Sequence, residues 1–336
     1  MNMTFESPSK PVQDSPAAGL RVFRLPVRSG LGWSALILGA VCAAVAHAAV
    51  PRPLADEPLI DNWPLPGVVI QVGSQSARCV IDTGSTVGMI SSELSGGAET
   101  MQRAKVNVAH GKGVWMPLVR LRDVSIGEAR RRFTDFLRRD SGWIDRKMPA
   151  PCLLGGSFLD NFTVEFDFVA HRLRLFERGT RIADLVGSAQ RELGVLPTRP
   201  STGHIEFEAE VAGIKAKAFL DTGWPTTGGN AALLEALGVA AEDPRMTTST
   251  ETTRSGIAIT HRVFEPGPIR IGAQTFDRVK VDFGPYAVRS NESAAEPFLH
   301  VGVNLLEGHR LFVDMAGGEV AIVRAPQLDS PAPTGN

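Results

Sequence analysis

The tripeptide Asp-Thr-Gly occurs twice in this chain of 336 residues, and the residues around the two copies also correspond. The copies are Asp82–Gly84 and Asp221–Gly223, which lie 139 residues apart, and each ends an apolar run. Upstream of each copy, an alternating segment, a glycine turn and an apolar segment are typical of a β-hairpin. A repeat of such long period predicts two copies of one structural unit, and it therefore decides the fold.

The correspondence continues downstream of each triplet. The apolar-apolar-Gly segment Leu153–Gly155 has its counterpart in His300–Gly302. The interval from the triplet's aspartate to the glycine of this segment is 73 residues in the first copy and 81 in the second. A strand is predicted after each segment, over residues 162–168 and 311–315.

The residue types at the two triplets indicate acid–base chemistry. A carboxylate at the end of a buried strand is costly to place, so Asp82 and Asp221 call for a functional explanation. Two carboxylates that meet can share one proton, which supplies both a base and an acid for activating water. The sequence has no His-x-x-x-His cluster and no Gly-x-Ser-x-Gly motif. We therefore expect neither a metal nor a cofactor.

From roughly residue 58 to residue 325 the sequence resembles the aspartic protease superfamily. It is similar to the retropepsin-like bacterial branch, in a bilobal, pepsin-like arrangement within one chain. The resemblance implies an all-β fold of two pseudo-twofold-related, β-barrel-like lobes, the acid protease fold, with a few short helices. It also implies that Asp82 and Asp221 are catalytic and that an extended peptide lies between the lobes.

The resemblance assigns supporting roles to the residues next to the aspartates. Thr83 and Thr222 match the threonines whose hydroxyl groups lock the two active-site loops together. Gly84 and Gly223 let the backbone approach closely, and Ser85 matches a hydroxyl residue that supports one aspartate from outside.

Trp224 departs from this pattern, because it occupies the position that corresponds to Ser85. Indole donates only one hydrogen bond and is much bulkier than a hydroxymethyl group. Either Thr226 or Thr227 supplies the missing support, or Asp221 is held less well, or Trp224 walls a substrate pocket.

Two functional hypotheses follow. The first is an aspartic endopeptidase that cleaves a peptide or protein substrate as a monomer, since both aspartates belong to one chain. The alternative is a catalytically weak or inactive pepsin-fold module that binds extended peptides outside the cytoplasm. A net charge of −1 argues against a nucleic-acid partner. The basic run at residues 130–132 fits a solvated strand face better than a binding patch.

A glycine-rich hairpin tip in the first unit matches the flap of the family. Gly111, Lys112 and Gly113 form the tip, and Trp115 is the candidate flap aromatic. The alternative is a plain surface hairpin with Trp115 in the core.

The N-terminal 50 residues are interpreted as a targeting element. Three arginines precede an uncharged stretch, residues 29–51, and the sequence Ala-His-Ala at residues 46–48 fits a signal-peptide cleavage site. Residues 31–50 could also remain as a membrane anchor, since about 20 apolar residues suffice to span a bilayer. Either way the rest of the chain is exported, as a periplasmic, secreted or membrane-anchored protein. An anchored form would be a membrane-tethered processing protease.

Cysteine usage is compatible with export. In the fold that the resemblance implies, the strands of Cys79 and Cys152 are neighbours, so a disulfide can form in an oxidising compartment. The alternative is two buried free thiols that act as small apolar residues.

The organisation along the chain follows from the repeat. Helices are expected from Arg181 to Leu193 and from Ala231 to Leu237, where Gly238 ends the second. The predicted segments are a targeting element (1–50), a first lobe (58–178), a connector (179–202), a second lobe (203–325) and a disordered tail (326–336).

Overall fold

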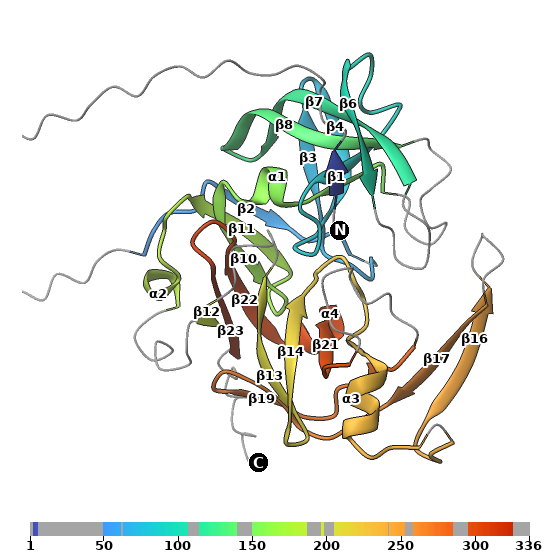
Figure 1. The fold of residues 1–336 in the computed structure, drawn as a ribbon. Helices are drawn as coiled ribbons and strands as arrows, with labels where there is room; N and C mark the ends of the chain where they lie inside the picture. Colours follow the sequence, from blue (N-terminus) through green and yellow to red (C-terminus); the bar gives the residue numbers. More distant parts are fainter. Residues whose placement is uncertain are drawn as a thin grey trace, which may run out of the picture. The chain divides into compact units, whose positions relative to one another are not determined.

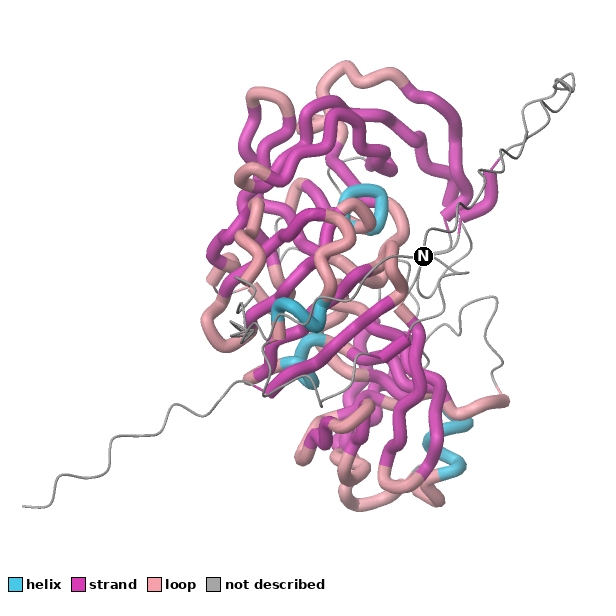
Figure 2. The backbone as a smooth tube through the Cα atoms, turned by 90° about the vertical axis from the view of Figure 1, so that its left-hand side faces the viewer, coloured by secondary structure: helices cyan, strands magenta, loops and turns pink. Residues whose placement is uncertain are grey.

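The structure is a computed structural model, and it describes residues 3–5, 50–61, 63–106, 114–139, 150–186, 196–197, 205–240, 242–252, 258–284 and 295–324. These residues are mostly β-strand, and the helices among them are short (Figure 1). The backbone view shows strands throughout, with helix confined to a few turns (Figure 2). All the described residues belong to one compact unit of the chain. The prediction of a mostly β fold is therefore confirmed.

The first half of the chain builds an eight-stranded sheet in the order β1-β6-β7-β3-β4-β9-β5-β8. Because β7 also pairs with β8, the strands from β7 through β3, β4, β9 and β5 to β8 form a closed ring, which leaves few exposed strand edges. The strands are β1 (Met3–Phe5), β3 (Gly67–Val72), β4 (Gln75–Ile81), β5 (Gly88–Ser91), β6 (Thr100–Val106), β7 (Val114–Ile126), β8 (Ala129–Arg139) and β9 (Cys152–Leu154).

The second half builds a nine-stranded sheet in the order β16-β17-β20-β15-β21-β14-β13-β18-β19. Its strands are β13 (Glu206–Val211), β14 (Ile214–Leu220), β15 (Gly228–Gly229), β16 (Thr247–Thr252), β17 (Ala258–Phe264), β18 (Ile269–Ile271), β19 (Gln274–Phe276), β20 (Val281–Asp282) and β21 (Phe298–Val301).

The same set of strand pairings occurs in both sheets. β4 pairs antiparallel with β3 and parallel with β9, and β9 pairs antiparallel with β5. β14 pairs in the same way with β13 and β21, and β21 pairs antiparallel with β15. A one-turn helix follows each set, α1 (Gly156–Leu159) after β9 and α4 (Val303–Leu306) after β21. The two hairpins predicted before the triplets are confirmed as β3–β4 and β13–β14.

A third sheet takes strands from both halves, in the order β12-β23-β22-β10-β11-β2. Its central strands, β10 (Phe162–Asp167) and β22 (His309–Asp314), run antiparallel with Val164 opposite Val313. Every residue of β10 is buried, so this ladder lies inside the protein and joins the two halves. The outer strands are β2 (Ala55–Pro58), β11 (Arg172–Glu177), β12 (Leu196–Pro197) and β23 (Glu319–Arg324).

The helix predicted after the second triplet is confirmed as α3 (Ala231–Ala236). The Asn230 side chain accepts a hydrogen bond from the Leu233 amide, which caps the first turn. Gly238 follows with a φ of +65°, a conformation that glycine adopts without strain and that ends the helix. In the connector, the prediction of a helix from Arg181 to Leu193 is wrong in its length, because α2 (Ile182–Leu185) is a single turn that ends at its C-cap Val186. Residues 187–195 lie outside the described residues.

Three predicted segments lie mostly or wholly outside the described residues. They are the targeting element, of which only residues 3–5 and 50 are described, the remaining part of the connector, and the tail from residue 326. Within the described ranges, no helix has the length and apolarity needed to cross a membrane.

Candidate active site

Asp82 and Asp221 occupy matching positions at the ends of two strands. Asp82 follows β4, and its amide donates to the Leu154 carbonyl of the parallel neighbour β9 at 2.9 Å. Asp221 follows β14, and its amide donates to the Val301 carbonyl of β21 at 3.0 Å. The last residues of β4 and β14 are buried on both faces of the strand, so each carboxyl group emerges from the core rather than from a solvated loop.

The two triplets are joined by hydrogen bonds that Thr83 and Thr222 exchange. The Thr83 amide donates to Thr222 Oγ1 at 3.1 Å, and the Thr222 amide donates to Thr83 Oγ1 at the same distance. Each hydroxyl then donates to a backbone carbonyl across the interface, Thr83 to Leu220 at 3.3 Å and Thr222 to Ile81 at 2.7 Å. Both threonines are buried, so these four bonds fix the two triplets against each other.

Gly84 and Gly223 bring the two carboxyl groups together. A Cβ added at Gly84 would overlap the Asp221 carboxyl group, and one added at Gly223 would overlap the Asp82 carboxyl group. Each glycine amide also donates to the Oδ1 of the aspartate two residues before it, at 2.7 Å for Gly84 and 2.8 Å for Gly223. Glycine is thus required because each carboxyl group lies directly against the opposite triplet.

The glycines of the two apolar-apolar-Gly segments meet the same steric demand. A Cβ at Gly155 would overlap the Ser85 carbonyl, and one at Gly302 would overlap the Thr226 backbone. The segments therefore press against the loops that follow the triplets and hold them in place.

The electrostatics of the pair favour retention of a proton. Asp82 is only 9% exposed. Burial raises the pKa of Asp82 well above its ordinary range, and the charge of Asp221 and a hydrogen bond with its carboxyl group raise this pKa further. Two neighbouring carboxylates in such surroundings do not both ionise readily, so one proton stays on the pair.

Ser85 and Trp224 differ in their contacts as well as in their chemistry. The Ser85 hydroxyl donates to the Val87 carbonyl at 2.8 Å, so its proton is directed to the backbone and not to a carboxylate. The Trp224 ring stacks on the His300 ring, with centroids 5.6 Å apart and an interplanar angle of 25°. Thr227, one of the two residues expected to replace Ser85, donates its hydroxyl proton to Asn304 Oδ1 at 2.8 Å.

His300 contacts the second aspartate, and the sequence analysis did not identify it as a site residue. Its Nε2 lies 2.9 Å from Asp221 Oδ2. His300 belongs to the segment that was matched to Leu153–Gly155, where it stands at the position of the apolar Leu153. An imidazole at a position that is apolar in the other copy was the signal that could have revealed this contact.

The predicted flap is described only at its base. Gly111, Lys112 and Gly113 lie outside the described residues, but Val106 pairs with Val114, so β6 and β7 form the expected hairpin. Trp115 is 41% exposed, so the alternative that placed it in the core is wrong. The flap role itself stays a prediction.

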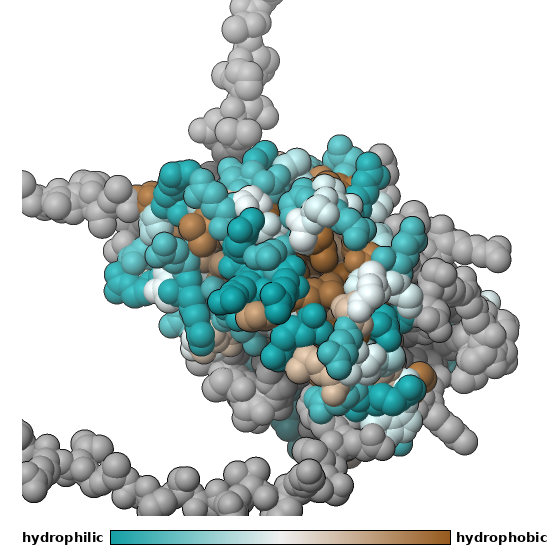
Figure 3. All heavy atoms as spheres, turned by 90° about the horizontal axis from the view of Figure 1, so that it is seen from above, coloured by the Kyte–Doolittle hydropathy of each residue, from teal (hydrophilic) through white to brown (hydrophobic). Residues whose placement is uncertain are grey.

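Figure 3 shows one face of the molecule, on which apolar residues are exposed between polar ones.

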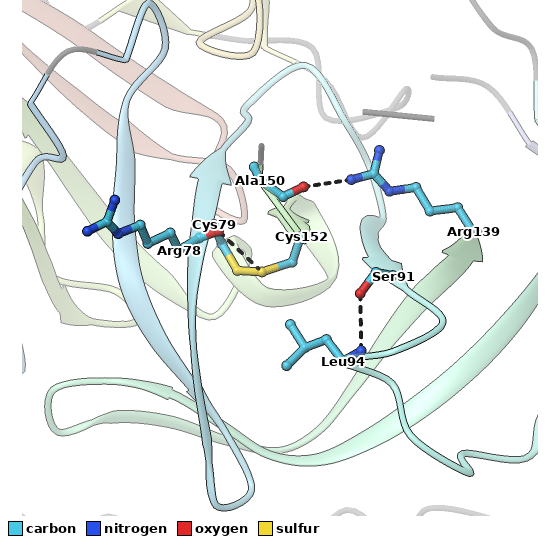
Figure 4. Close-up of a disulfide and its surroundings, with 7 residues drawn as sticks. All are labelled: Arg78, Cys79, Ser91, Leu94, Arg139, Ala150 and Cys152. Carbon is cyan, nitrogen blue, oxygen red and sulfur yellow. Dashed lines mark hydrogen bonds between the residues drawn. A yellow bond between two sulfur atoms is a disulfide. The ribbon is translucent and has the colours of Figure 1, made fainter. Parts of the chain in front are cut away.

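Cys79 and Cys152 form a disulfide between two adjacent parallel strands (Figure 4). They are direct partners in the β4–β9 ladder, with their Cα atoms 4.7 Å apart. The alternative of two free thiols is therefore not what the structure contains. The bond ties the strand that ends at Asp82 to the strand that precedes Gly155.

No protein-family model matches this chain, and no curated protein sequence matches it. Within the described ranges, no three side chains of histidine, cysteine, aspartate or glutamate gather as a metal site would require. The interpretation of the site therefore depends on the contacts of the two triplets and of His300.

Proposed function

We propose that this chain is an aspartic endopeptidase in which Asp82 and Asp221 share one proton and activate water. The single observation that supports this function best is the reciprocal contact of the triplets. Each carboxyl group lies against the glycine of the opposite triplet, while the threonines exchange hydrogen bonds. A proton-sharing pair of carboxyl groups needs this geometry, and a pair of ordinary strand-end turns would have no reason to adopt it.

The finer fold assignment is part of the proposal. We interpret the two halves as pseudo-twofold-related lobes of an acid protease, over residues 58–178 and 203–325. The repeated pairings around β4 and β14 support this interpretation. So does the order of the six-stranded sheet, in which β2, β11 and β10 of the first half mirror β12, β23 and β22 of the second. Because each half contributes one aspartate, the site needs no second chain.

The mechanism follows from a pair that holds one proton. The ionised carboxylate takes a proton from water as the water oxygen attacks the peptide carbonyl carbon. The protonated carboxyl group gives its proton to the carbonyl oxygen, which forms a neutral tetrahedral intermediate. Collapse of this intermediate returns one hydroxyl proton to the pair, while the other carboxyl group protonates the leaving nitrogen as the C–N bond breaks. The pair ends the cycle with the one proton with which it began.

The Cys79–Cys152 bond supports export as the setting of this activity. Disulfides persist in oxidising compartments and are rare in the bacterial cytoplasm. The proposal is thus a periplasmic, secreted or membrane-anchored enzyme with its catalytic part outside the cytoplasm. N-terminal sequencing of the mature protein decides between a cleaved signal peptide and a retained anchor.

The function is tested with the full chain and its Asp82→Asn and Asp221→Asn variants. Each protein is incubated with a peptide library between pH 3 and 8, and the products are identified by mass spectrometry. We expect internal cleavage by the wild-type chain and none by either variant. Asp61→Asn is the matched control, because Asp61 is exposed and takes no part in the site. If one of the two site variants keeps full activity, the shared-proton model is wrong.

The rival hypothesis, a peptide-binding module, rested on Trp224. In the structure Trp224 packs against His300, which itself contacts Asp221, so the tryptophan does not leave this aspartate without a neighbouring hydrogen-bonding group. Binding of library peptides without any cleavage product would favour the module over the enzyme.

A further inference from the structure

The hydrogen-bonding surroundings of the two aspartates are not equivalent. Asp221 Oδ1 accepts the Gly223 amide at 2.8 Å, and its Oδ2 lies 2.9 Å from His300 Nε2. Asp82 Oδ1 accepts the corresponding amide of Gly84 at 2.7 Å. At the position of His300, however, the first half carries Leu153, whose side chain has no proton to donate.

His300 is held in place from several sides. In the sheet, β21 lies between β14 and β15, with His300 opposite both Phe219 and Gly228. The imidazole contacts the Phe219 ring, with centroids 5.3 Å apart, and stacks on the Trp224 indole. Its side chain is only 18% exposed and that of Asp221 only 15%, so bulk water screens the pair weakly. The Trp224 indole thus forms part of the packing around the imidazole.

The other titratable groups on the neighbouring elements are paired or exposed. Across Gly228 from His300, β20 carries Asp282, whose carboxylate is paired with His261. Helix α3, which also packs against β21, contributes one ionisable side chain, Glu235, and it is exposed. On β14, the exposed Lys217 is paired with Glu296. Asp221 is therefore the carboxylate that His300 faces.

We infer that His300 is a positioning residue that holds Asp221 as the ionised base of the pair and leaves the shared proton on Asp82. The inference builds on the proposed function, because it assigns the two chemical roles within the same site. A proton on His300 Nε2 directed at Asp221 Oδ2 stabilises the carboxylate form of Asp221 over its acid form. No donor of this kind stands at the Leu153 position next to Asp82.

The direction of the Asp82 shift agrees with this assignment. Burial and the neighbouring Asp221 charge raise the pKa of Asp82, which keeps it protonated where an ordinary aspartate is ionised. Asp221 then takes the proton from water while the bond from water oxygen to carbonyl carbon forms, and Asp82 gives its proton to the carbonyl oxygen.

Two substitutions separate the donor from the packing of the side chain. His300→Leu installs the residue type that the first half carries at the equivalent position, and it removes the donor. His300→Gln keeps a neutral N–H group of similar reach. His171→Asn is the control, because it removes an exposed imidazole from the β10–β11 turn. Thermal unfolding of each full-length variant establishes that it is folded.

The decisive measurement is the titration of the aspartate carboxyl carbons by carbon-13 NMR, with Asp82→Asn and Asp221→Asn used to assign the two resonances. We expect the pH at which Asp221 ionises to rise by about one unit in His300→Leu, as for the loss of a close charged or donor partner. The midpoint pH on the acid side of the kcat/KM profile should rise by the same amount. Below that pH, kcat/KM should therefore be about tenfold lower than in the wild type. His300→Gln should recover most of this loss, and His171→Asn should match the wild type.

Each remaining outcome has a definite meaning. An unchanged Asp221 titration in His300→Leu overturns the inference whether or not the protein cleaves peptides. A shifted titration in a protein that cleaves nothing upholds the role of His300 and removes the proposed function. If His300→Leu does not fold, nitrogen-15 NMR of the wild-type imidazole decides. His300 must carry a proton on Nε2 across the pH range of the titration, and a neutral ring protonated on Nδ1 alone contradicts the inference.

Discussion

Glu165 of β10 and Arg310 of β22 form an ion pair across the central ladder of the six-stranded sheet. The carboxylate Oε1 of Glu165 accepts from Arg310 Nε at 2.8 Å and lies 2.7 Å from its Nη2. Glu165 is only 1% exposed, and Arg174 is its second cationic partner at 2.9 Å. A buried carboxylate of the first half is thus neutralised in part by a residue of the second half.

Replacing Arg310 by methionine should therefore destabilise the protein. Loss of Arg310 leaves the buried Glu165 carboxylate with Arg174 as its remaining cationic partner, and we expect a cost at the lower end of that of breaking a buried ion pair, about 3 kcal/mol. The free energy of unfolding in urea, followed by circular dichroism, measures this cost. Arg52→Met is the control, because the Arg52–Glu128 pair is exposed and its loss should change stability by less than about 1 kcal/mol. Equal losses in the two variants would contradict the prediction.

Thr222→Val should cost both stability and activity. The substitution keeps the shape of the side chain but removes the proton donated to Ile81 and the oxygen that accepts the Thr83 amide. Two buried backbone groups are then left without partners, at a cost of about 2–4 kcal/mol. Thr134→Val is the matched control, because this buried hydroxyl has no partner among the described residues. The free energy of unfolding in urea and the rate of peptide cleavage are measured on both variants. Thr134→Val should be neutral or stabilising, and an equal loss of unfolding free energy in the two variants would contradict the prediction.

Gly84→Ala should abolish cleavage, because the new methyl group would occupy the space of the Asp221 carboxyl group. Gly97→Ala offers a clean comparison, since a Cβ at Gly97 meets nothing within 4 Å and the residue has no positive φ. We expect Gly97→Ala to keep full activity and to be neutral or stabilising by up to about 1 kcal/mol. Peptide cleavage and the melting temperature are measured on both. A Gly84→Ala protein with wild-type kcat would show that the Asp221 carboxyl group does not lie against Gly84 in the active protein.

The sequence was sufficient to predict the parts of the fold that are local or repeated. The hairpins before Asp82 and Asp221 and the α3 helix each depend on a short pattern of apolar residues, glycine turns and caps, and each is where it was expected. The repeat also identified which segments of the two halves correspond. The two triplets could therefore be interpreted as a pair.

Contacts between distant residues were harder to predict. His300 contacts Asp221 although the two residues are 79 positions apart in the sequence, and Arg310 contacts Glu165 at a separation of 145 positions. No local sequence pattern indicates either pair. Trp115 shows a second limit, since the alternation of a strand reveals two faces without saying which one is buried. The disulfide was left open for a related reason: the resemblance implied neighbouring strands, but only the register, which sets Cys79 directly opposite Cys152, decides whether their side chains can bond.

Removing the disulfide should weaken the first half. The bond closes a loop of 73 residues, and the loss of such a constraint costs about 2–4 kcal/mol. The Cys79→Ala, Cys152→Ala double variant should therefore unfold at a lower urea concentration than the wild type. Dithiothreitol should lower the stability of the wild type and leave the double variant unchanged. Equal sensitivity of both proteins to the reductant would contradict the assignment of the bond.

Asp82→Asn should stabilise the protein at high pH and abolish its activity. The pKa of Asp82 is raised in the folded state, mainly by burial, whereas an unfolded chain ionises it near pH 3.9. Below that pH the carboxyl group is protonated in both the folded and the unfolded protein. Its titration then contributes no difference in the free energy of unfolding between the wild type and Asp82→Asn. As the pH rises toward the folded pKa, the unfolded state gains by ionising and the wild type loses stability relative to Asp82→Asn.

Urea unfolding at pH 3 and at pH 8 measures this difference. We expect equal stabilities of wild type and Asp82→Asn at pH 3, and an advantage of about 1–2 kcal/mol for the variant at pH 8. Asp61→Asn, on the exposed surface, should track the wild type at both pH values. A wild type that is more stable than Asp82→Asn at pH 8 would mean that the folded protein stabilises the Asp82 charge. The pair would then not retain the proton that the proposed mechanism requires.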